Sequence, residues 1–321
     1  MKLFISDIIQ AKNRIKNHIV ETPLVFSDSL SEQLSSKVYF KLENLQKTGS
    51  FKARGALSKI STLINQEKSK GVITASSGNH AQAVFYAASL FDTSALVVVP
   101  ENTAQAKISG IQRFGGEIVQ YGASYDEAEE YAEQLAKETG RKFIHAFNDV
   151  VTMAGQGTIG SEAMLEKPDF DVILVPVGGG GLLNGIATAA KAINPDVQVI
   201  GVQSEASPAW HESFMAGKMV DVTYQASIAD GIYGGIHEAP LQLAFSRIAG
   251  SILVSEESIS QAMKWMATNH RYMIEGSSAV TIAALLQNQV PDIADKNVLC
   301  IITGGNVDAS LFLKVMNAHQ F

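Results

Sequence analysis

The stretch KTGSFKARGA, residues 47–56, holds one lysine between a polar turn and the start of a helix. Residues 48–50 are turn and cap formers, whereas residues 53–57 favour helix. Lys52 is therefore expected near the positive end of a helix dipole, where an amine loses its proton more easily. A neutral amine is a nucleophile that forms an imine with an aldehyde. The alternative is a solvated surface lysine, and the rest of the chain distinguishes the two.

Composition and charge narrow the class of protein. With 321 residues, of which 46% are hydrophobic, the chain can bury a large core and form two lobes. The net charge of -7 argues against nucleic acid or an anionic membrane as the main partner. The single cysteine, Cys300, lies in an apolar run, which excludes a disulfide within the chain and predicts a buried thiol. Because residues 1–10 lack a signal-peptide core and no run reaches transmembrane length, we expect a soluble cytoplasmic protein.

Strand-like and helix-like patterns alternate along most of the chain. Short apolar runs predict strands, and the amphipathic or alanine-rich stretches between them predict helices. The predicted strands are residues 38–42, 72–75, 95–99, 117–120, 143–144, 172–177, 197–202, 252–254 and 298–302. This alternation predicts an α/β fold with two open twisted-sheet lobes and flanking helices. We expect a large domain formed by residues 1–73 and 147–321 and a small domain formed by residues 74–146.

Four consecutive glycines, Gly178–Gly181, separate a predicted strand from a predicted helix. Such a loop leaves backbone N–H groups free to surround an anion, and the helix dipole adds to the attraction, so a phosphate is the expected guest. The loop matches neither the GxGxxG pattern nor a Walker A loop, which disfavours dinucleotides and nucleoside triphosphates. The structural alternative is a tight turn with close backbone packing.

A second candidate anion site is the stretch SSGNH, residues 76–80, which follows a strand and opens a helix. Its hydroxyls, amide and helix-start N–H groups suit a substrate carboxylate. The alternative is a helix cap with no ligand, and His80 is more readily explained as a structural histidine than as a catalytic base.

The last predicted strand ends in TGGN, residues 303–306. Ligands of open α/β sheets bind at the carboxyl ends of strands, where Lys52, residues 76–80, Gly178–Gly181 and Thr303 are all expected to lie. An imine-forming lysine, a phosphate loop, a carboxylate loop and a small hydroxyl together fit pyridoxal 5'-phosphate (PLP) as cofactor and an amino acid as substrate.

Five stretches make the chain resemble the fold-type II PLP enzymes, which have a tryptophan synthase β-like fold. They are SFKARGA at 50–56, SSGNH at 76–80, AGQGT at 154–158, the four glycines at 178–181 and GGN at 304–306. They occur in order over nearly the whole chain. Within the family, the closest resemblance is to the threonine/serine dehydratases and serine racemases, and most of all to degradative threonine dehydratase.

The resemblance implies a role for each residue of the predicted site. Lys52 is the Schiff-base lysine, and Ser77 is the second catalytic residue, facing the lysine across the substrate. The implied cofactor-binding residues are Phe51, Lys52, Asn79 (at the pyridine 3'-oxygen), Gly178, Gly179, Gly180, Gly181 and Leu182 (at the phosphate), Glu275, and Thr303 (at the pyridine nitrogen). The implied substrate-binding residues are Ser76, Ser77, Gly78, Asn79 and His80.

The chain departs from the family pattern at several positions. Thr303 stands where serine or cysteine is commoner, but it keeps a hydroxyl that can donate to an unprotonated pyridine nitrogen. Racemases and many dehydratases bind a divalent cation through two acidic residues, which here are Gln203 and Ala209, so we expect no metal site unless Glu205 rebuilds one. Residues 203–205 and 147–149 look more like degradative threonine dehydratases. From the end at Phe321 we expect this protein to lack the C-terminal regulatory domain of the biosynthetic threonine dehydratases.

We therefore expect a PLP-dependent threonine/serine ammonia-lyase (EC 4.3.1 class) that converts L-threonine or L-serine to 2-oxobutanoate or pyruvate plus ammonia. Two alternatives stay open: a serine or hydroxyaspartate racemase/dehydratase, and a PLP-binding or amino-acid-sensing protein without turnover. The expected partners are a small amino-acid substrate and further copies of the chain in a homodimer or homotetramer, without nucleic acid or membrane. The preferred hydroxy amino acid, the ratio of dehydratase to racemase activity, nucleotide regulation and the oligomer size are left open.

Overall fold

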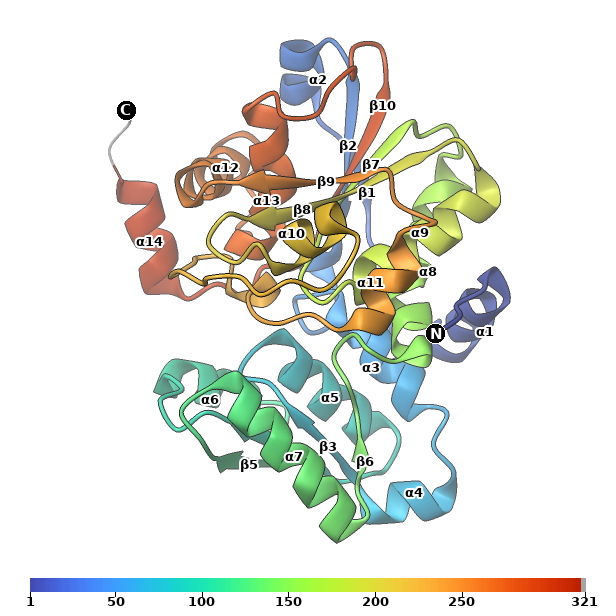
Figure 1. Cartoon of the computed structure of the whole chain (residues 1–321), viewed down its shortest axis with the longest axis vertical. Coiled ribbons are helices and arrows are strands. Elements are labelled where there is room, and N and C mark those ends of the chain that lie inside the picture. Colours follow the sequence, from blue (N-terminus) through green and yellow to red (C-terminus); the bar gives the residue numbers. More distant parts are fainter. Residues whose placement is uncertain (319–321) are drawn as a thin grey trace.

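Two β-sheets of different size form the framework of the chain (Figure 1). The computed structural model describes residues 1–318. In the six-stranded sheet the order is β1 (Leu24–Phe26), β2 (Lys37–Leu42), β10 (Asn297–Ile302), β7 (Val172–Pro176), β8 (Gln198–Ser204) and β9 (Gly250–Val254). In the four-stranded sheet the order is β5 (Glu117–Gln120), β4 (Ala95–Val99), β3 (Val72–Ala75) and β6 (Lys142–Phe143).

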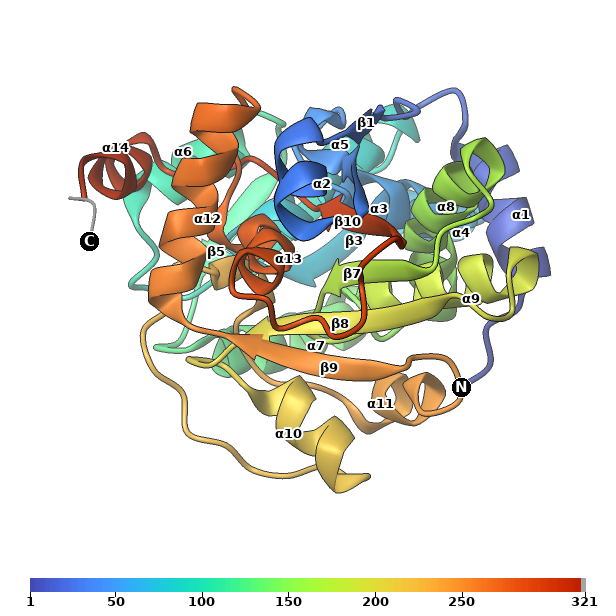
Figure 2. The same cartoon turned by 90° about the horizontal axis from the view of Figure 1, so that it is seen from above.

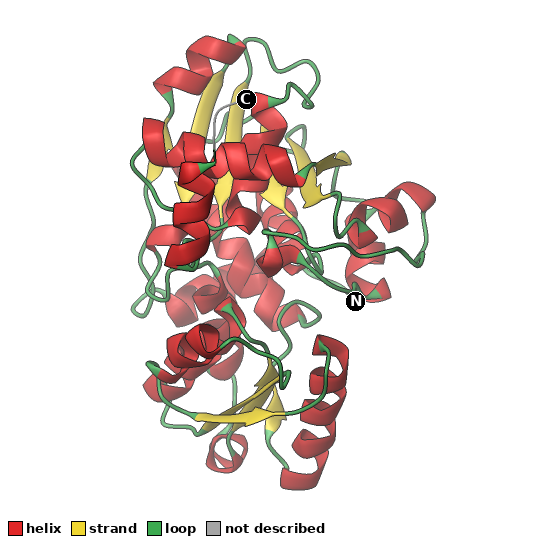
Figure 3. Cartoon of the chain, turned by 90° about the vertical axis from the view of Figure 1, so that its left-hand side faces the viewer, coloured by secondary structure: helices red, strands yellow, loops and turns green. Residues whose placement is uncertain are grey.

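Helices flank both sheets, and Figure 3 shows the two groups of strands with helices around and between them. Among residues 1–318, no helix is both long enough and apolar enough to cross a membrane. The helices are α1 (Ile5–Ile15), α2 (Asp28–Leu34), α3 (Lys52–Ile60), α4 (Asn65–Lys70), α5 (Asn79–Leu90), α6 (Gln105–Gln112), α7 (Tyr125–Thr139), α8 (Val150–Glu166), α9 (Gly181–Ile193), α10 (Ala209–Ala216), α11 (Glu238–Ala244), α12 (Glu256–Asn269), α13 (Gly276–Leu286) and α14 (Ala309–Asn317), with the 3₁₀ helices η1 (Glu43–Leu45) and η2 (Asp230–Ile232).

Neighbouring strands run parallel throughout both sheets, except that β1 pairs antiparallel with β2. Figure 2 shows β10, β7, β8 and β9 side by side in the larger sheet. Because parallel strands end at the same edge of a sheet, the segments that follow β2, β10, β7 and β8 gather at one edge.

Alternate side chains of the larger sheet fill two separate cores. On β10, Val298, Cys300 and Ile302 belong to the core that includes α12 and α13, whereas Leu299 and Ile301 belong to the core that includes α8 and α9. Burial on both faces explains why these strands are continuous apolar runs. Cys300 is a free, fully buried thiol, as its apolar surroundings predicted.

A cluster of four buried charged residues, which we call the Arg54 cluster, lies between α3, α8 and the end of β2. It consists of Lys41, Glu43, Arg54 and Glu162, whose side chains are at most 2% exposed. The Arg54 guanidinium donates to Glu43 over 2.8 Å and to Glu162 over 2.5 Å, and Lys41 Nζ lies 3.0 Å from Glu162. The two positive and two negative charges of the Arg54 cluster neutralise one another.

The predicted α/β class is confirmed, and every predicted strand is found within two residues of its predicted ends. The short antiparallel edge strand β1 was not predicted, because three residues carry too little periodicity. The division into a large and a small domain stays a prediction. The four-stranded sheet is drawn from residues 72–143, and β3 begins at Val72, two residues before the predicted start of the small domain.

Candidate active site

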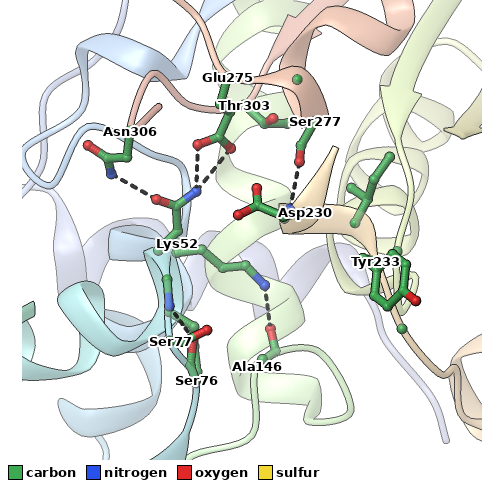
Figure 4. A pocket seen from close by; sticks show the side chains of 18 of the residues that line it. Lys52, Ser76, Ser77, Ala146, Asp230, Tyr233, Glu275, Ser277, Thr303 and Asn306 are labelled. Atoms are coloured by element: carbon green, nitrogen blue, oxygen red, sulfur yellow. Dashed lines mark hydrogen bonds between the residues drawn. The ribbon is translucent and has the colours of Figure 1, made fainter. Parts of the chain in front are cut away.

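A cavity of about 810 Å³ lies between the two sheets, at the carboxyl ends of their strands. Its wall includes Ala75 at the end of β3, Pro176 at the end of β7 and Thr303 directly after β10. Figure 4 shows part of this wall. Every residue of the predicted site lines it: Phe51, Lys52, Ser76, Ser77, Gly78, Asn79, His80, Gly178, Gly179, Gly180, Gly181, Leu182, Glu275 and Thr303. The structure thus brings these segments together, while the chemical role of each residue stays a prediction.

The turn that precedes Lys52 is bound to the segment after β10. The Phe51 amide donates to the Thr303 carbonyl over 2.9 Å, and the Gly305 amide donates to the Gly49 carbonyl over 2.9 Å. Gly49 has a φ of +73°, and a Cβ there would collide with the Asn306 side chain, so the turn requires glycine. These contacts fix the start of α3, and with it Lys52, at the cavity wall.

The Lys52 amine is half-buried, and among residues 1–318 no carboxylate forms an ion pair with it. Its Nζ donates to the Ala146 carbonyl over 3.3 Å and lies 5.1 Å from the centre of the Phe51 ring. Burial lowers the pKa of Lys52 to about 8, although the negative charge of Glu275 opposes the shift. The direction agrees with the expectation, but the cause is burial, whereas the sequence argument relied on the helix dipole.

Glu275 directly precedes α13, and its side chain belongs to a chain of hydrogen bonds along the cavity (Figure 4). Asn79 Nδ2 donates to both carboxylate oxygens, over 2.9 and 3.0 Å, and Asn306 Nδ2 donates to Asn79 Oδ1 over 2.8 Å. Burial raises the pKa of Glu275 to about 7, while the Asn79 amide opposes the shift. Glu275 therefore changes its charge near neutral pH. The contact of Asn79 with the pyridine 3'-oxygen stays a prediction.

The glycine loop has a packed side and an open side. A Cβ on Gly179 would collide with the Phe147 ring, and Gly180, with a φ of +84°, would meet Trp210 in the same way. Close packing, the structural alternative, is therefore present. On the other side, the loop lines the cavity, and α9 begins at Gly181. Within residues 1–318, the amides of Gly178–Gly181 donate no hydrogen bond to the protein, which leaves them available to an anion.

The loop from Ser76 to His80 leads from β3 into α5. The Gly78 amide donates to Ser76 Oγ over 3.2 Å, and both Ser76 and Ser77 line the cavity. His80 is buried, and its Nε2 lies 2.9 Å from the Ile144 carbonyl, which can only accept. Burial lowers the pKa of His80 to about 3, so the ring is neutral and Nε2 carries the proton. This geometry favours the structural interpretation of His80 over a catalytic base.

Gln203 and Ala209 are the two positions at which the sequence comparison expected metal-binding carboxylates to be missing. Gln203 is fully buried, and its Oε1 accepts from the His211 amide over 3.1 Å. Ala209 begins α10, and Glu205 is exposed. In the part of the chain that the structure describes, no three His, Cys, Asp or Glu side chains gather as a metal site would require. The expectation of a metal-free site stays a prediction.

Sequence reasoning missed three residues at or behind the cavity wall. Asp230, in the glycine-rich loop 229–235, forms an ion pair of 2.7 Å with Lys107 of α6 and so joins a helix of the smaller sheet to the loop opposite. Ser278 lies behind Thr303, with 2.9 Å between the two hydroxyl oxygens. No local pattern marks these residues, because their partners lie far away in the sequence.

The residues present fit PLP. The unbonded amides at the start of α9 suit its phosphate, the Lys52 amine suits its aldehyde, and the Thr303 hydroxyl offers the small polar contact expected at the ring nitrogen. The fit rests on the chemistry of these groups, which three separate segments bring to one cavity.

Comparison with known proteins supports this assignment. The pyridoxal-phosphate dependent enzyme family matches residues 15–304. An L-threonine ammonia-lyase of Geobacter sulfurreducens is 42% identical over 304 residues, which cover 94% of this chain and 75% of that protein. A catabolic L-threonine dehydratase, TdcB, of Staphylococcus aureus is 41% identical over 95% of this chain and 89% of its own length.

A solved structure is similar over nearly the same length. The serine racemase of maize superposes with a TM-score of 0.93 at 34% identity, covering 98% of this chain and 97% of the racemase. The two-sheet architecture is therefore shared with a protein of this group over the whole described fold. Since the family match extends over most of the sequence, the chain belongs to the family of pyridoxal-phosphate dependent enzymes.

Proposed function

We propose that this protein is a PLP-dependent ammonia-lyase that converts L-threonine and L-serine to 2-oxobutanoate and pyruvate with release of ammonia. The observation that carries the proposal is the Lys52 amine, with a pKa near 8, in one cavity with two loops suited to anions. The relatives named L-threonine ammonia-lyase and L-threonine dehydratase, at 41–42% identity, support the same reaction.

Lys52 performs the central proton transfer in this proposal. When bound, the cofactor supplies a conjugated ring that accepts the electron pair released as the substrate loses its α-proton. Lys52 Nζ accepts that proton, which requires the neutral amine, and burial keeps the neutral form accessible close to neutral pH. The substrate then loses water, and hydrolysis gives the keto acid and ammonia.

The two loops orient the reactants. The amides of Gly178–Gly181 hold the cofactor phosphate, and the hydroxyls and amides of residues 76–79 hold the substrate carboxylate. Both loops sit at helix starts, so the dipoles of α9 and α5 favour the bound anions. Glu275 and Asn306 hold the Asn79 side chain between them, which keeps this part of the wall in one arrangement.

A second candidate activity is racemisation of the substrate. Ser77 lines the same cavity as Lys52, so a hydroxyl is available to exchange a proton on the other face of the substrate. The similarity to maize serine racemase supports this alternative. We propose it as a minor activity beside the elimination.

Steady-state assays with L-threonine, L-serine, D-serine and 3-hydroxyaspartate test the proposal. We expect keto acid from L-threonine and L-serine to form faster than any D-isomer, which chiral chromatography of the same reactions measures. D-Serine accumulating faster than pyruvate would make racemisation the main activity. Binding of PLP without any turnover would reduce the protein to a sensor.

We further propose that the protein works in the cytoplasm as a homodimer or homotetramer. The large family of related enzymes and the negative net charge of -7 support a protein that acts on small amino acids rather than on nucleic acid. Light scattering on the purified holoenzyme measures the mass of the assembly directly.

A further inference from the structure

The segment of residues 144–149 crosses from the smaller sheet to the larger one, between β6 and α8. Ala146 and Phe147 of this segment line the cavity. The Ala146 carbonyl accepts from Lys52 Nζ over 3.3 Å (Figure 4). A Cβ on Gly179 would collide with the Phe147 ring, so this ring lies directly against the glycine loop. Two neighbouring residues of the crossing segment thus contact the lysine and the expected phosphate site.

The side chain of His145 closes the turn between these two contacts. The amides of Phe147 and Asn148 donate to His145 Nδ1 over 3.1 and 2.9 Å. Because a backbone N–H can only donate, Nδ1 is the accepting nitrogen of a neutral ring, and Nε2 carries the ring proton. The side chain is 12% exposed, and burial together with the neighbouring His237 and Lys52 lowers the pKa of His145 to about 3. The ring therefore stays neutral near neutral pH, and its acceptor remains available.

One peptide group connects the His145 ring to the Lys52 amine. A trans peptide is planar, and its C=O and N–H groups point in opposite directions. In the trans peptide between Ala146 and Phe147, the N–H donates to His145 Nδ1. The C=O of the same peptide accepts from Lys52 Nζ. Holding the N–H therefore also aims the C=O at the lysine, and the lone pair of the neutral amine points away from this carbonyl.

We infer that His145 is a positioning residue, whose Nδ1 fixes the turn of residues 145–148 and thereby orients the Lys52 amine and the Phe147 ring for cofactor binding. The inference rests on the proposed attachment of the cofactor at Lys52. His145 is not among the residues that line the cavity, so it acts through the turn and not by touching the cofactor.

A purely structural role is the alternative for the His145 ring. The ring lies edge-on to the rings of Phe147 and His237, with centroids 4.6 and 5.0 Å away. Its Nε2 lies 3.8 Å from Glu129 Oε1, which is too far for a hydrogen bond. Packing requires the ring, whereas positioning requires only an acceptor at Nδ1. Substitutions can separate these two requirements.

The test is the rate at which cofactor-free protein captures PLP, measured by stopped-flow absorbance well above pH 8. There the Lys52 amine, with a pKa of about 8, is neutral, so the rate reports its orientation and not its ionisation. His145→Phe keeps an aromatic ring without an acceptor, and His145→Leu lacks an acceptor in a smaller side chain. We expect both to capture PLP at least about tenfold more slowly, because one unpaired amide corresponds to about a factor of ten in an equilibrium.

His145→Asn is the matched rescue variant, because it removes the ring and keeps an acceptor. Its Oδ1 stands as many bonds from Cα as Nδ1 does, and asparagine commonly accepts from amides a few residues further along the chain. We expect it to capture PLP within about twofold of the wild-type rate. Circular dichroism shows which variants are folded. A folded variant without an acceptor that captures PLP at the wild-type rate would overturn the inference. Capture by His145→Asn as slow as by the other two would overturn it as well, in favour of packing.

A measurement on the wild type decides the point even if no variant folds. In protein with ¹⁵N-labelled histidine, NMR near neutral pH should show His145 as a neutral ring with its proton on Nε2. A proton on Nδ1 would exclude both amide donors and overturn the inference, as would attachment of PLP at a residue other than Lys52. Wild type that captures PLP at Lys52 but forms no keto acid would instead contradict the proposed function and leave the role of His145 standing.

Discussion

Two cations on the same helix, half-buried Lys52 and fully buried Arg54, have opposite electrostatic environments. Arg54 is enclosed by the carboxylates of Glu43 and Glu162, and although burial opposes the shift, these partners raise the pKa of the guanidinium above its usual value. In the part of the chain that the structure describes, Lys52 Nζ has the Ala146 carbonyl as its one hydrogen-bond partner, and burial lowers the pKa of Lys52 to about 8. The charge of the neighbouring groups therefore decides whether a side chain shielded from water keeps its charge or changes its protonation near neutral pH.

The same contrast holds for the carboxylates. Although burial opposes it, hydrogen bonds from Arg54 lower the pKa of Glu162, whereas burial raises the pKa of Glu275 to about 7 because a neutral amide is its main partner. The Arg54 cluster is thus a fixed structural element. Lys52 lies two residues before Arg54 on α3 and lines the cavity. There, Lys52 and Glu275 have pKa values of about 8 and about 7, so both gain and lose protons near neutral pH.

The largest expected effect is the loss of turnover in Lys52→Met. The amine both attaches the cofactor and carries the α-proton, and a positioned proton-transfer group alone contributes about 10²–10⁴-fold, so we expect a loss of at least about 10³-fold in kcat/KM. Keto-acid assays measure it. Borohydride treatment of wild type should fix PLP on the peptide that holds Lys52. Labelling at Lys47 or Lys59 instead would contradict the assignment.

Arg54→Met tests whether the Arg54 cluster stabilises the fold. It leaves the buried Glu43 carboxylate without its cation and leaves Glu162 paired with Lys41, and breaking a buried ion pair costs about 3–5 kcal/mol of unfolding free energy. Urea denaturation of the two proteins measures the difference. The matched control is Lys59→Met on the same helix, whose partly exposed pair with Asp149 should contribute only about 1 kcal/mol. Equal losses in both variants would mean that the Arg54 cluster has no special role.

The rate at which cofactor-free protein captures PLP should follow the ionisation of Lys52. Only the neutral amine forms the imine, and a pKa of about 8 raises its neutral fraction about 50-fold between pH 6 and pH 8, with a plateau above. Stopped-flow absorbance measures the rate. In Glu275→Gln, which removes the negative charge that supports the charged amine, the profile should move to lower pH. A profile centred near pH 10.5 would show an ordinary, solvated lysine.

Lys52→Met should also stabilise the cofactor-free fold, which is the opposite of Arg54→Met. A folded-state pKa lowered from 10.5 to about 8 gives a contribution to stability that is present above pH 10.5 and lost as the pH falls through 8, so wild type carries the full penalty at pH 7. At 1.36 kcal/mol per pKa unit, discounted for residual contact with water, the gain is about 1–3 kcal/mol at pH 7. Denaturation at pH 7 and pH 10 should show the gain shrinking at the higher pH.

The smallest expected effect is that of metal removal. Gln203 and Ala209 replace the two carboxylates that a divalent cation would favour, and exposed Glu205 is the remaining carboxylate of that segment. We expect kcat/KM to change by less than about twofold after exhaustive chelation. A large loss with EDTA that Mg²⁺ restores would show that Glu205 or another group rebuilds the site.

Sequence reasoning reached the parts of the site that are local. The turn before Lys52 and the glycines at 178–181 can be recognised in the sequence, because turn, cap and helix residues follow one another within a few positions. The strands were predicted because β-sheets buried on both faces need continuous apolar runs. The approach of these segments to one cavity followed from the rule for parallel strands, and the structure bears it out.

Sequence reasoning did not find contacts between residues that lie far apart in the sequence. Ser278 is the hydrogen-bond partner of Thr303, and Asp230 is the partner of Lys107, yet each pair is separated by many residues and by the packing of different elements. The pKa of Lys52 illustrates the same limit, because its direction follows from the helix start but its main cause, burial, exists only in the folded molecule. The turns and loops of the site can thus be predicted from short stretches of sequence. The hydrogen-bond partners and pKa values of its side chains depend on the folded structure.

The bonds between the lysine turn and the segment after β10 also constrain the order in which the protein can mature. Lys52 leaves the ribosome about 250 residues before Thr303, and β10 must then insert between β2 and β7, in the middle of the larger sheet. Until it does, the turn at Gly49–Phe51 has no strand end to hold it, and the reactive amine has no enclosed cavity. Such long-range closure is slow relative to local helix formation. The wall of the cavity around Lys52 is therefore complete only after this late strand has inserted into the larger sheet.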